Sequence, residues 1–281
     1  MKPFAFALVL GCAGCSTYSG PPGGAPAAKS VSTTYEVRPD VVYTPAAWPQ
    51  ARSADLYVPQ GPGPFPGVVM VHGGGWDARD RSDMTSAAKD LAARGYVVAN
   101  IDYRLVPAFR HPAQVEDVRA AVAWLHAHAD DLGLDPTRLA GWGYSAGAHL
   151  VALAATDHPP GASPFRAVVA GGMPADLPRY PKSPIITPFM GKPYAEDPEA
   201  WSRASPLHNV TADDPPMFLF HGTRDRLVDP AEPVAMQQKL QTAGVAVELL
   251  QLKGRGHITT FLFGGEARDR GIEFLDRYLR D

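Results

Sequence analysis

The repeated alternation of short apolar runs with helical patterns is the feature that most constrains how this chain can fold. Several runs, such as "GVVMV" at 67–71, are apolar throughout, which is typical of strands covered on both faces. Between the runs, apolar residues recur at helical spacing, as over 112–133 and from about 266 to 279. Strands alternating with helices predict an α/β fold with a mostly parallel sheet and helices on both faces. The expected strands are 55–58, 67–71, 96–103, 138–144, 166–172, 216–221 and 245–252.

Length and composition fit one large α/β domain, which we expect to cover residues 31–281. Of the 281 residues, 45% are hydrophobic and 20% are charged, so the chain can bury a sizeable core. The formal net charge of −3 and the absence of a basic block give no reason to expect a nucleic-acid partner. No run of 18 apolar residues occurs, so we expect no membrane-spanning segment.

The first fifteen residues, "MKPFAFALVLGCAGC", have the layout of a secretion signal: a charge at Lys2, a short apolar segment, then small residues. They resemble a bacterial lipoprotein signal, whose cleavage leaves a cysteine for acylation. The three residues before Cys12 fit the lipoprotein cleavage motif better, whereas cleavage before Cys15 leaves a longer signal peptide. Either cysteine is therefore the candidate for lipidation. An ordinary signal peptide is the alternative.

Residues 16–30, "STYSGPPGGAPAAKS", predict a flexible Gly/Pro-rich tether between this signal and the domain. The resemblance implies a lipid-anchored protein of the bacterial cell envelope, with the anchor as its only membrane contact. Neither Ala13 nor Ser16 is the aspartate that commonly retains such proteins at the inner membrane, which favours the outer membrane in a Gram-negative host. A periplasmic or secreted protein is the alternative.

The segment "GWGYSAGAHL" at 141–150 places Ser145 between Gly143 and Gly147, directly after an expected strand and before an Ala-rich helix. One interpretation is a plain turn in which the glycines relieve crowding. The other is a nucleophile elbow, a strained turn that exposes the serine oxygen to a substrate. The pattern is too short to decide alone, so the other strand ends must supply a base, an acid and an oxyanion site.

Those groups follow the other expected strands. "HGGGW" at 72–76 offers glycines whose N–H groups can point at a ligand, and the N–H of Ala146 begins the helix after Ser145. Asp225 and Asp229 follow the run at 216–221, and Asp229 is better explained as a helix cap. His257 lies in a glycine-flanked loop after the last run. The order Ser145, Asp225, His257 is that of α/β-hydrolases, which predicts a nucleophile, an orienting acid and a general base.

The remaining histidines have simpler interpretations. His72 is expected to brace the glycine loop, His149 to pack under Ser145, and His221 to hold its own loop by a hydrogen bond. No Cys/His pair or His-x-x-x-His spacing indicates a metal site.

Together these motifs resemble the carboxylesterase branch of the α/β-hydrolases, and within it the feruloyl-esterase-like and hormone-sensitive-lipase-like enzymes. The resemblance rests on "HGGGW", "YRL" (103–105), "HPAQVEDVRAAVAWL" (111–125), "GLDPTRLAGWGYSAGAHL" (133–150), "ASPLHNV" (204–210) and "HGTRDRLV" (221–228). It implies a cofactor-free serine hydrolase of small-molecule carboxylic esters, with Gly74, Gly75 and Ala146 as oxyanion donors. "GHITTF" departs from the commoner "GHGF" after the catalytic histidine, which leaves the subfamily open.

A Pro-rich insertion at about 174–210 is too long for a simple connection, and we expect it to form a small cap over the site. It lacks long apolar stretches, so short acyl chains are the expected substrates. Two alternatives stay open: an aryl-formamidase, since the same triad cleaves amides, and a non-catalytic binding lipoprotein. The sequence indicates no oligomeric state.

Overall fold

The computed structural model describes residues 16–20 and 32–280. The predicted signal peptide with Cys12 and Cys15, and most of the predicted tether, lie outside these residues. Among the described residues, no helix combines the length and the apolarity needed to cross a bilayer.

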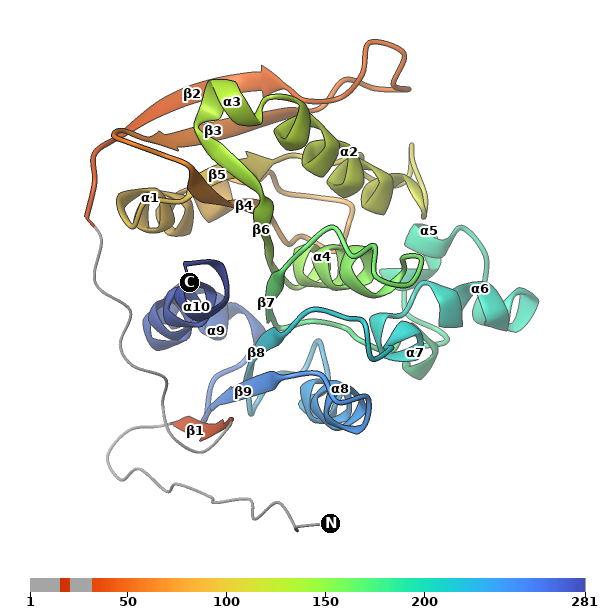
Figure 1. Cartoon of the computed structure of the whole chain (residues 1–281). Helices are drawn as coiled ribbons and strands as arrows, with labels where there is room; N and C mark the ends of the chain where they lie inside the picture. The colour runs from red at the N-terminus through yellow and green to blue at the C-terminus, as the bar shows by residue number, and fades with distance from the viewer. Residues whose placement is uncertain (1–15, 21–31, 281) are drawn as a thin grey trace.

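Within the described residues the chain forms one nine-stranded sheet in the order β1-β9-β8-β7-β6-β4-β5-β3-β2 (Figure 1). The six strands from β9 to β5 run parallel to one another, whereas β1, β3 and β2 are antiparallel to their neighbours. The mostly parallel sheet predicted from the sequence is therefore confirmed. The strands are β1 (Ser16–Ser19), β2 (Tyr35–Val42), β3 (Ser53–Pro59), β4 (Phe65–Val71), β5 (Val97–Ile101), β6 (Leu134–Tyr144), β7 (Ala167–Gly171), β8 (Met217–Gly222) and β9 (Val247–Leu252).

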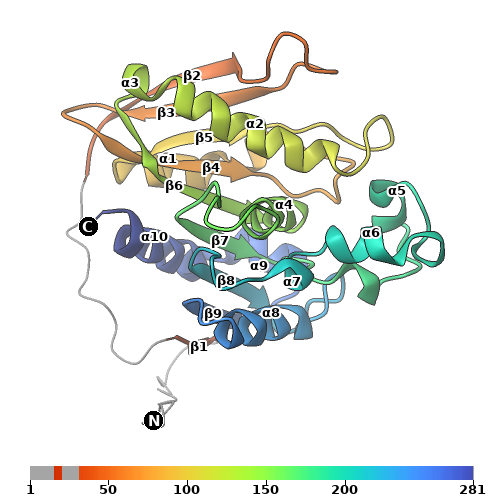
Figure 2. The same ribbon diagram turned by 45° about the vertical axis from the view of Figure 1, so that its right-hand side comes forward.

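Helices cover both faces of the sheet, as the apolar strands predict (Figures 1 and 2). In β4, Val69 and Val71 belong to one buried cluster with α2, α4 and α8, whereas Val68 and Met70 belong to another with α1 and α10. This alternation explains why the run at 67–71 has no polar position. The helices are α1 (Thr85–Ala93), α2 (Ala113–Ala127), α3 (Ala129–Leu132), α4 (Ala146–Thr156), α5 (Ile186–Met190), α6 (Pro198–Arg203), α7 (Pro206–Asn209), α8 (Ala231–Thr242), α9 (His257–Phe263) and α10 (Gly265–Leu279), with 3₁₀ turns η1 (Arg81–Met84), η2 (Leu177–Arg179) and η3 (Tyr194–Glu196).

Strand β1 corrects the prediction of a tether that begins at residue 16. Ser16 pairs with Leu252 and Ser19 with Leu249 at the edge of the sheet. The Gln237 side chain also donates to Ser19 Oγ at 2.8 Å. The sequence "STYS" shows no apolar alternation because an edge strand is held chiefly by backbone hydrogen bonds, so the pattern gave no signal. The tether prediction is wrong for these four residues.

The insertion between β7 and β8 forms a group of short helices, α5 to α7, which extends beyond the sheet on the side where the parallel strands end (Figure 2). Two large aromatic side chains, Phe189 and Trp201, are fully buried within it. The Trp201 indole N–H donates to the carbonyl of Lys192 at 3.1 Å. The Pro-rich segment is therefore a packed cap with its own buried side chains rather than an extended loop.

Candidate active site

The turn at Ser145 is strained, as a nucleophile elbow requires. Ser145 lies between the end of β6 and the start of α4 with φ of 54° and ψ of −119°, a backbone conformation that L-residues rarely adopt. A Cβ at Gly143 would lie 2.3 Å from the backbone of Gly147, and one at Gly147 would lie 2.1 Å from the carbonyl oxygen of Val71. The two glycines are thus required by close backbone contacts, which a relaxed turn would not need.

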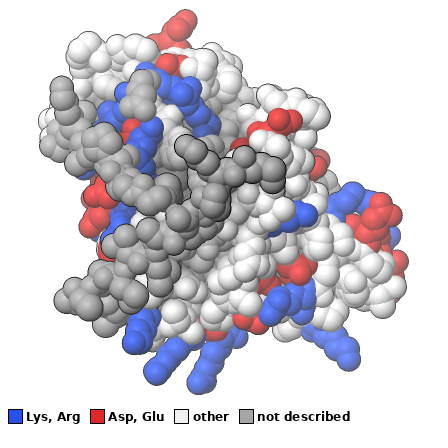
Figure 3. Space-filling model, turned by 60° about the horizontal axis from the view of Figure 1, so that its bottom comes forward, with Lys and Arg blue, Asp and Glu red and all other residues white. Residues whose placement is uncertain are grey.

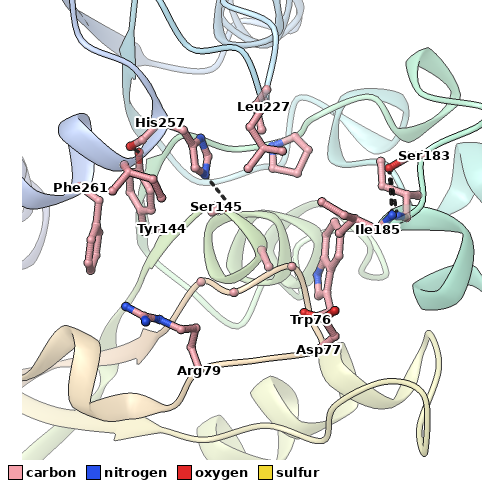
Figure 4. A pocket seen from close by; sticks show the side chains of 18 of the residues that line it. Trp76, Asp77, Arg79, Tyr144, Ser145, Ser183, Ile185, Leu227, His257 and Phe261 are labelled. Atoms are coloured by element: carbon pink, nitrogen blue, oxygen red, sulfur yellow. Dashed lines mark hydrogen bonds between the residues drawn. The ribbon is translucent and has the colours of Figure 1, made fainter.

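The structure brings Ser145, His257 and Asp225 into one chain of hydrogen bonds, of which Figure 4 shows the bond between Ser145 and His257. Ser145 Oγ donates to His257 Nε2 at 2.9 Å, and His257 Nδ1 donates to Asp225 Oδ2 at 2.6 Å. His257 is the first residue of α9 rather than part of a loop, which corrects the sequence-based placement. Since Ser145 follows β6, Asp225 follows β8 and His257 follows β9, all three lie at the carboxyl edge of the parallel strands, where such sheets place their sites.

The Asp225 carboxylate is held in one orientation. Its Oδ1 accepts the N–H groups of Leu227 and Val228, both at 2.9 Å, which leaves Oδ2 for His257. Burial of this carboxyl opposes its ionisation, but the hydrogen bonds from His257 and Val228 outweigh that effect, so the pKa of Asp225 lies below its ordinary value. Asp225 is therefore an anion that keeps the Nδ1–H tautomer of His257.

Tyr144 also positions His257, a role that the sequence analysis missed. Its hydroxyl donates to the carbonyl of His257 at 2.6 Å, and the two rings lie 5.2 Å apart. Gly172, with φ of 56°, leaves room for both rings, since a Cβ there would lie 2.9 Å from Tyr144 Cζ and 3.0 Å from His257 Cε1. The position of Tyr144 directly before the candidate nucleophile was the one available signal.

The glycine loop after β4 presents backbone N–H groups next to Ser145. Gly74 and Gly75 have φ of 101° and 63°, and the carbonyl of Gly74 accepts the N–H of Ala78 at 3.1 Å, which closes a tight turn. Among the described residues, the N–H groups of Gly74 and Gly75 donate to no protein acceptor. Both glycines line the cavity together with Ala146, so their donors are available to a bound oxyanion.

Two further side chains brace this loop from behind. The ring of His72 stacks on that of Tyr103 at 4.3 Å, and its Nδ1 lies 2.7 Å from the carbonyl of Gly73. The Tyr103 hydroxyl donates to the same carbonyl at 3.1 Å. Burial lowers the pKa of His72, which keeps this ring neutral. The predicted bracing role of His72 agrees with these contacts.

The other candidates have structural roles. Asp229 Oδ1 accepts the N–H of Ala231 at the start of α8, and its Oδ2 binds Arg179 at 2.7 Å.

His149 is fully buried, with Nε2 2.7 Å from the carbonyl of Ala204, and burial lowers its pKa to about 3. His221 Nε2 donates to the carbonyl of Val228 at 3.0 Å, which holds the loop that carries Asp225. Over the described residues, no group of three His, Cys, Asp or Glu side chains is arranged to hold a metal ion.

A cavity of about 530 Å³ opens at Ser145, and most of the side chains that line it are apolar. In Figure 4, Trp76 and Ile185 lie on one side of Ser145, whereas Arg79 and Phe261 lie on the other. The lining residues other than Ser145, Ala146, His257 and the glycine loop are Trp76, Asp77, Arg79, Asp83, Tyr144, Pro174, Tyr180, Ser183, Ile185, Ile186, Leu227, Val228, Ile258 and Phe261.

The cap closes the Trp76 side of this cavity. The Trp76 ring stacks on Phe189 of α5 at 4.3 Å, and His149 packs edge-on against Trp76 at 5.1 Å. Ile185 and Ile186, also from the cap, reach the cavity wall. The cap therefore limits the depth of the apolar side with large, closely packed side chains.

Arg79 occupies the opposite wall in an unusual conformation. Its φ of 75° lies in the left-handed region, which is uncommon for residues other than glycine. Its guanidinium binds Asp83 at 2.7 Å, and this pair places a charged group at the rim of an otherwise apolar cavity.

Glu232 joins the cap to the body of the domain, a role that the sequence analysis did not detect. The side chain is 1% exposed, and Oε2 accepts the N–H groups of Ala175 and Asp176 at 3.0 and 2.9 Å, at the start of the cap. Burial raises the pKa of Glu232 from 4.5 to about 7. In the sequence, Glu232 stands three residues after Asp229, which is the pattern of an ordinary helix-capping box.

Comparison with known proteins gives one family match and several relatives. The BD-FAE family model matches residues 54–240. Esterase LipC of Mycobacterium tuberculosis is 32% identical over 216 residues, which cover 69% of this chain and 53% of LipC. Carboxylic ester hydrolase LipN of the same organism is 45% identical over 100 residues, or 34% of this chain and 26% of LipN. This chain thus spans about half the length of the first curated relatives that it matches.

Solved structures show the same fold. A truncated carbohydrate esterase from gut microbiota superposes with a TM-score of 0.77 at 22% identity, covering 91% of this chain and 99% of that one. A thermophilic esterase of Thermogutta terrifontis with bound butyrate superposes with a TM-score of 0.72 at 24% identity, covering 86% and 93%. At these identities the likeness concerns the arrangement of the sheet and its helices.

Proposed function

Because the chain belongs to the BD-FAE family of α/β-hydrolases, we propose that it is a serine carboxylesterase that works through an acyl-enzyme intermediate. The observation that carries this proposal is the continuous hydrogen-bond chain from Ser145 Oγ through His257 to Asp225, next to N–H groups with no protein acceptor. These are the parts that acyl transfer needs: a nucleophile, a base with a fixed tautomer, and donors for an oxyanion.

In the proposed acylation step, Ser145 Oγ attacks the carbonyl carbon of the ester while its proton passes to His257 Nε2. The carbonyl oxygen becomes an anion that accepts hydrogen bonds from the N–H groups of Gly74, Gly75 and Ala146. When the tetrahedral intermediate collapses, the bond to the alcohol oxygen breaks and His257 returns the proton to that oxygen. The alcohol leaves, and the acyl group remains on Ser145.

Water then repeats the sequence on the acyl-enzyme. His257 Nε2 takes a proton from the water, whose oxygen attacks the acyl carbon, and the second tetrahedral intermediate releases Ser145 Oγ with that proton. The carboxylic acid leaves, and the starting state returns. Asp225 stays ionised throughout and stabilises the imidazolium form of His257 in both steps.

We propose short acyl chains as the preferred substrates. The support is the closed apolar side of the cavity, where Trp76, Phe189 and Ile185 limit the available length within about 530 Å³. The solved esterase of Thermogutta terrifontis was seen with butyrate bound, which is a short acid in a protein of the same fold.

Hydrolysis of p-nitrophenyl esters with acyl chains of two to twelve carbons tests this proposal, with Ser145→Ala as the inactive control. The expected kcat/KM is highest for chains of two to four carbons. Acetylated xylan, methyl ferulate and N-formylkynurenine belong in the same assay, because the triad could act on an aromatic ester or a formamide. Faster turnover of long-chain emulsified triglyceride than of soluble short esters contradicts the short-chain proposal.

We also propose that the protein is held in a bacterial envelope by a lipid on Cys12 or Cys15. The support is the order of charge, apolar segment, small residues and cysteine in the first fifteen residues. Detergent phase partitioning of the wild type beside Cys12→Ser, Cys15→Ser and the double variant tests this. The expected result is that the wild type enters the detergent phase and the double variant does not. A wild type that stays in the aqueous phase contradicts the anchor.

A further inference from the structure

Most exposed large apolar side chains of the described structure gather beside the active-site cavity. Leu227 follows β8, and Ile258, Leu262 and Phe263 belong to α9, with exposures of 51, 63, 61 and 63%. The other exposed large apolar residues among those described are Val37 and Val42, on β2 at the opposite edge of the sheet. A cluster of this kind, unlike a single exposed residue, indicates a contact surface.

The same surface is basic. Arg224, Arg226 and Lys253 are exposed, Arg255 is half-buried, and none of the four pairs with a carboxylate of the described residues. Two segments, 223–227 and 253–263, carry these residues. They lie side by side, because the Arg224 N–H donates to the carbonyl of Arg255 and the Gly254 N–H to Thr223 Oγ1, both at 2.9 Å. Within them the acidic side chain is that of Asp225, which is buried. We call these two segments the basic-apolar face. Figure 3, which views the molecule from the side that carries β1, shows Lys and Arg side chains projecting from its lower margin.

The N-terminal segment of the chain meets this face. Because Ser16 pairs with Leu252, it lies level with the last residue of β9, directly before Lys253. The Ser16 hydroxyl also donates to Glu266, near the start of α10, at 2.9 Å. Cys15 is bonded to Ser16, and Cys12 is four residues away from it, or at most about 14 Å along the chain. A lipid on Cys15 would therefore be attached beside the basic-apolar face, and a lipid on Cys12 within that reach of Ser16.

We propose that the basic-apolar face docks on the anionic surface of a lipid bilayer. This inference rests on the envelope location proposed above, and it assigns the orientation of the catalytic domain on that membrane. The positive charge complements anionic headgroups, and the apolar side chains can enter the boundary between headgroups and acyl chains. A single acyl chain would anchor the protein only marginally, whereas a multiply acylated cysteine would anchor it stably. The basic surface next to the attachment point would strengthen the first kind of anchor and would orient the domain in either case.

The geometry favours a membrane over a second copy of this chain. In a two-fold dimer the same face meets itself, which would bring four basic residues against four others. The two segments contain no exposed acid, and the nearby acids at the surface, Asp229 and Glu266, already pair with Arg179 and Arg270. The consequence for catalysis follows from Leu227 and Ile258, which belong to the face and also line the cavity. Docking turns the mouth of the cavity towards the headgroups, so the enzyme would meet esters that are presented at the membrane.

Vesicle co-sedimentation tests the proposal on the full chain carrying Cys12→Ser/Cys15→Ser, so that no lipid modification contributes. The vesicles contain phosphatidylcholine with or without one third phosphatidylglycerol. Two variants alter the face outside the cavity, Arg226→Gln/Lys253→Gln and Leu262→Ser/Phe263→Ser. Their matched controls are Lys89→Gln, an exposed cation on α1, and Val37→Ser/Val42→Ser on β2. The N-terminal segment is common to all of these chains, so differences between them report the face.

The parent chain should bind anionic vesicles and bind the neutral ones much more weakly. Each basic side chain near an anionic surface contributes a factor of about five, so the double charge variant should bind about 25-fold more weakly. The apolar variant should lose about tenfold or more, whereas both controls should match the parent. All variants should hydrolyse a soluble short ester at the parental rate, which establishes that they are folded.

Equal binding of parent, face variants and controls overturns the proposal, and so does loss of binding that tracks concentration-dependent dimerisation in sedimentation velocity. The result is separable from the proposals on which it depends. Absence of lipidation in the phase-partitioning experiment removes the anchor but leaves vesicle binding by the face to be observed. Absence of ester hydrolysis in the parent and in every variant concerns the catalytic proposal and is measured without vesicles. The vesicle result then still stands, with thermal unfolding as the check on the fold.

Discussion

Replacement of Asp225 by Asn should abolish most of the proposed ester hydrolysis by changing the tautomer of His257. Asp225 Oδ1 accepts two backbone N–H groups, from Leu227 and Val228. An Asn at this position keeps both bonds only if its Oδ1 stays there. Its NH₂ group then faces His257 Nδ1, which has to become an acceptor. The imidazole proton moves to Nε2, the nitrogen that should accept the proton of Ser145.

The expected loss is about 10⁴-fold in kcat, or about 5.5 kcal/mol in transition-state stabilisation, as found when the same change is made in a serine protease triad. KM should change little, because Asp225 does not line the cavity. The fold should remain, since an Asn of the same shape preserves the turn at Leu227 and Val228.

Steady-state hydrolysis of p-nitrophenyl acetate measures the effect, with thermal unfolding as the check on the fold. Asp229→Asn is the matched control, because Asp229 Oδ1 accepts the N–H of Ala231, the first residue of α8, and Asp229 binds Arg179. An Asn side-chain oxygen can accept the same N–H. This control variant should retain most of the wild-type kcat. Retention of more than a tenth of the wild-type kcat by Asp225→Asn, or a crippled Asp229→Asn, refutes the assignment of the orienting acid.

Three other predictions concern stability and the pocket. Gly147→Ala should cost about 3 kcal/mol or more in unfolding free energy, because its Cβ meets the Val71 carbonyl at 2.1 Å, whereas Gly265→Ala, with open space, should cost nothing. Equal denaturation midpoints for these two variants would be inconsistent with the close contact at the elbow. Because the pKa of Glu232 is about 7 in the folded protein and 4.5 in the unfolded chain, the folded state binds its proton more tightly. The stability that this proton contributes is fully present below pH 4.5 and is lost as the pH rises through about 7. Between pH 4 and pH 8 the wild type should therefore lose about 3 kcal/mol of unfolding free energy relative to Glu232→Gln, as measured by urea titration. A difference between the two proteins that does not change with pH contradicts the buried carboxyl. Ile185→Ala should extend the preferred acyl chain by about two carbons, and an unchanged ester profile would place the acyl group elsewhere.

The sequence predicted the parallel strands and the order of the site residues because both depend on strong local signals. Fully apolar runs such as 67–71 occur where helices cover a sheet on both faces, and the carboxyl ends of such strands meet along one edge. Ser145, Asp225 and His257 each follow one of these runs, so their proximity could be inferred without coordinates. The glycines at 143 and 147, on either side of Ser145, indicated the strained turn.

The features that the sequence did not predict depend on contacts between distant segments. Strand β1 is polar and pairs through its backbone with β9, more than 200 residues away. Glu232 is buried because the start of the cap folds over it, and nothing in its neighbours along the chain indicates this. The cap contains short helices broken by prolines, so its apolar residues do not recur at a regular spacing. The sequence therefore did not predict that the cap packs around Trp201 and Phe189.

Covalent labelling by a fluorophosphonate, followed by peptide mass spectrometry, tests most directly whether Ser145 is an activated nucleophile. Labelling requires both the base at His257 and a serine oxygen that a reagent can reach, and the hydrogen-bond chain to Asp225 supplies the former. The prediction is one adduct per chain, on the peptide that contains Ser145, with loss of ester hydrolysis in proportion to labelling and no adduct in Ser145→Ala. A folded protein that takes up no label, or that is labelled equally after Ser145→Ala, contradicts the proposal that this site carries out acyl transfer.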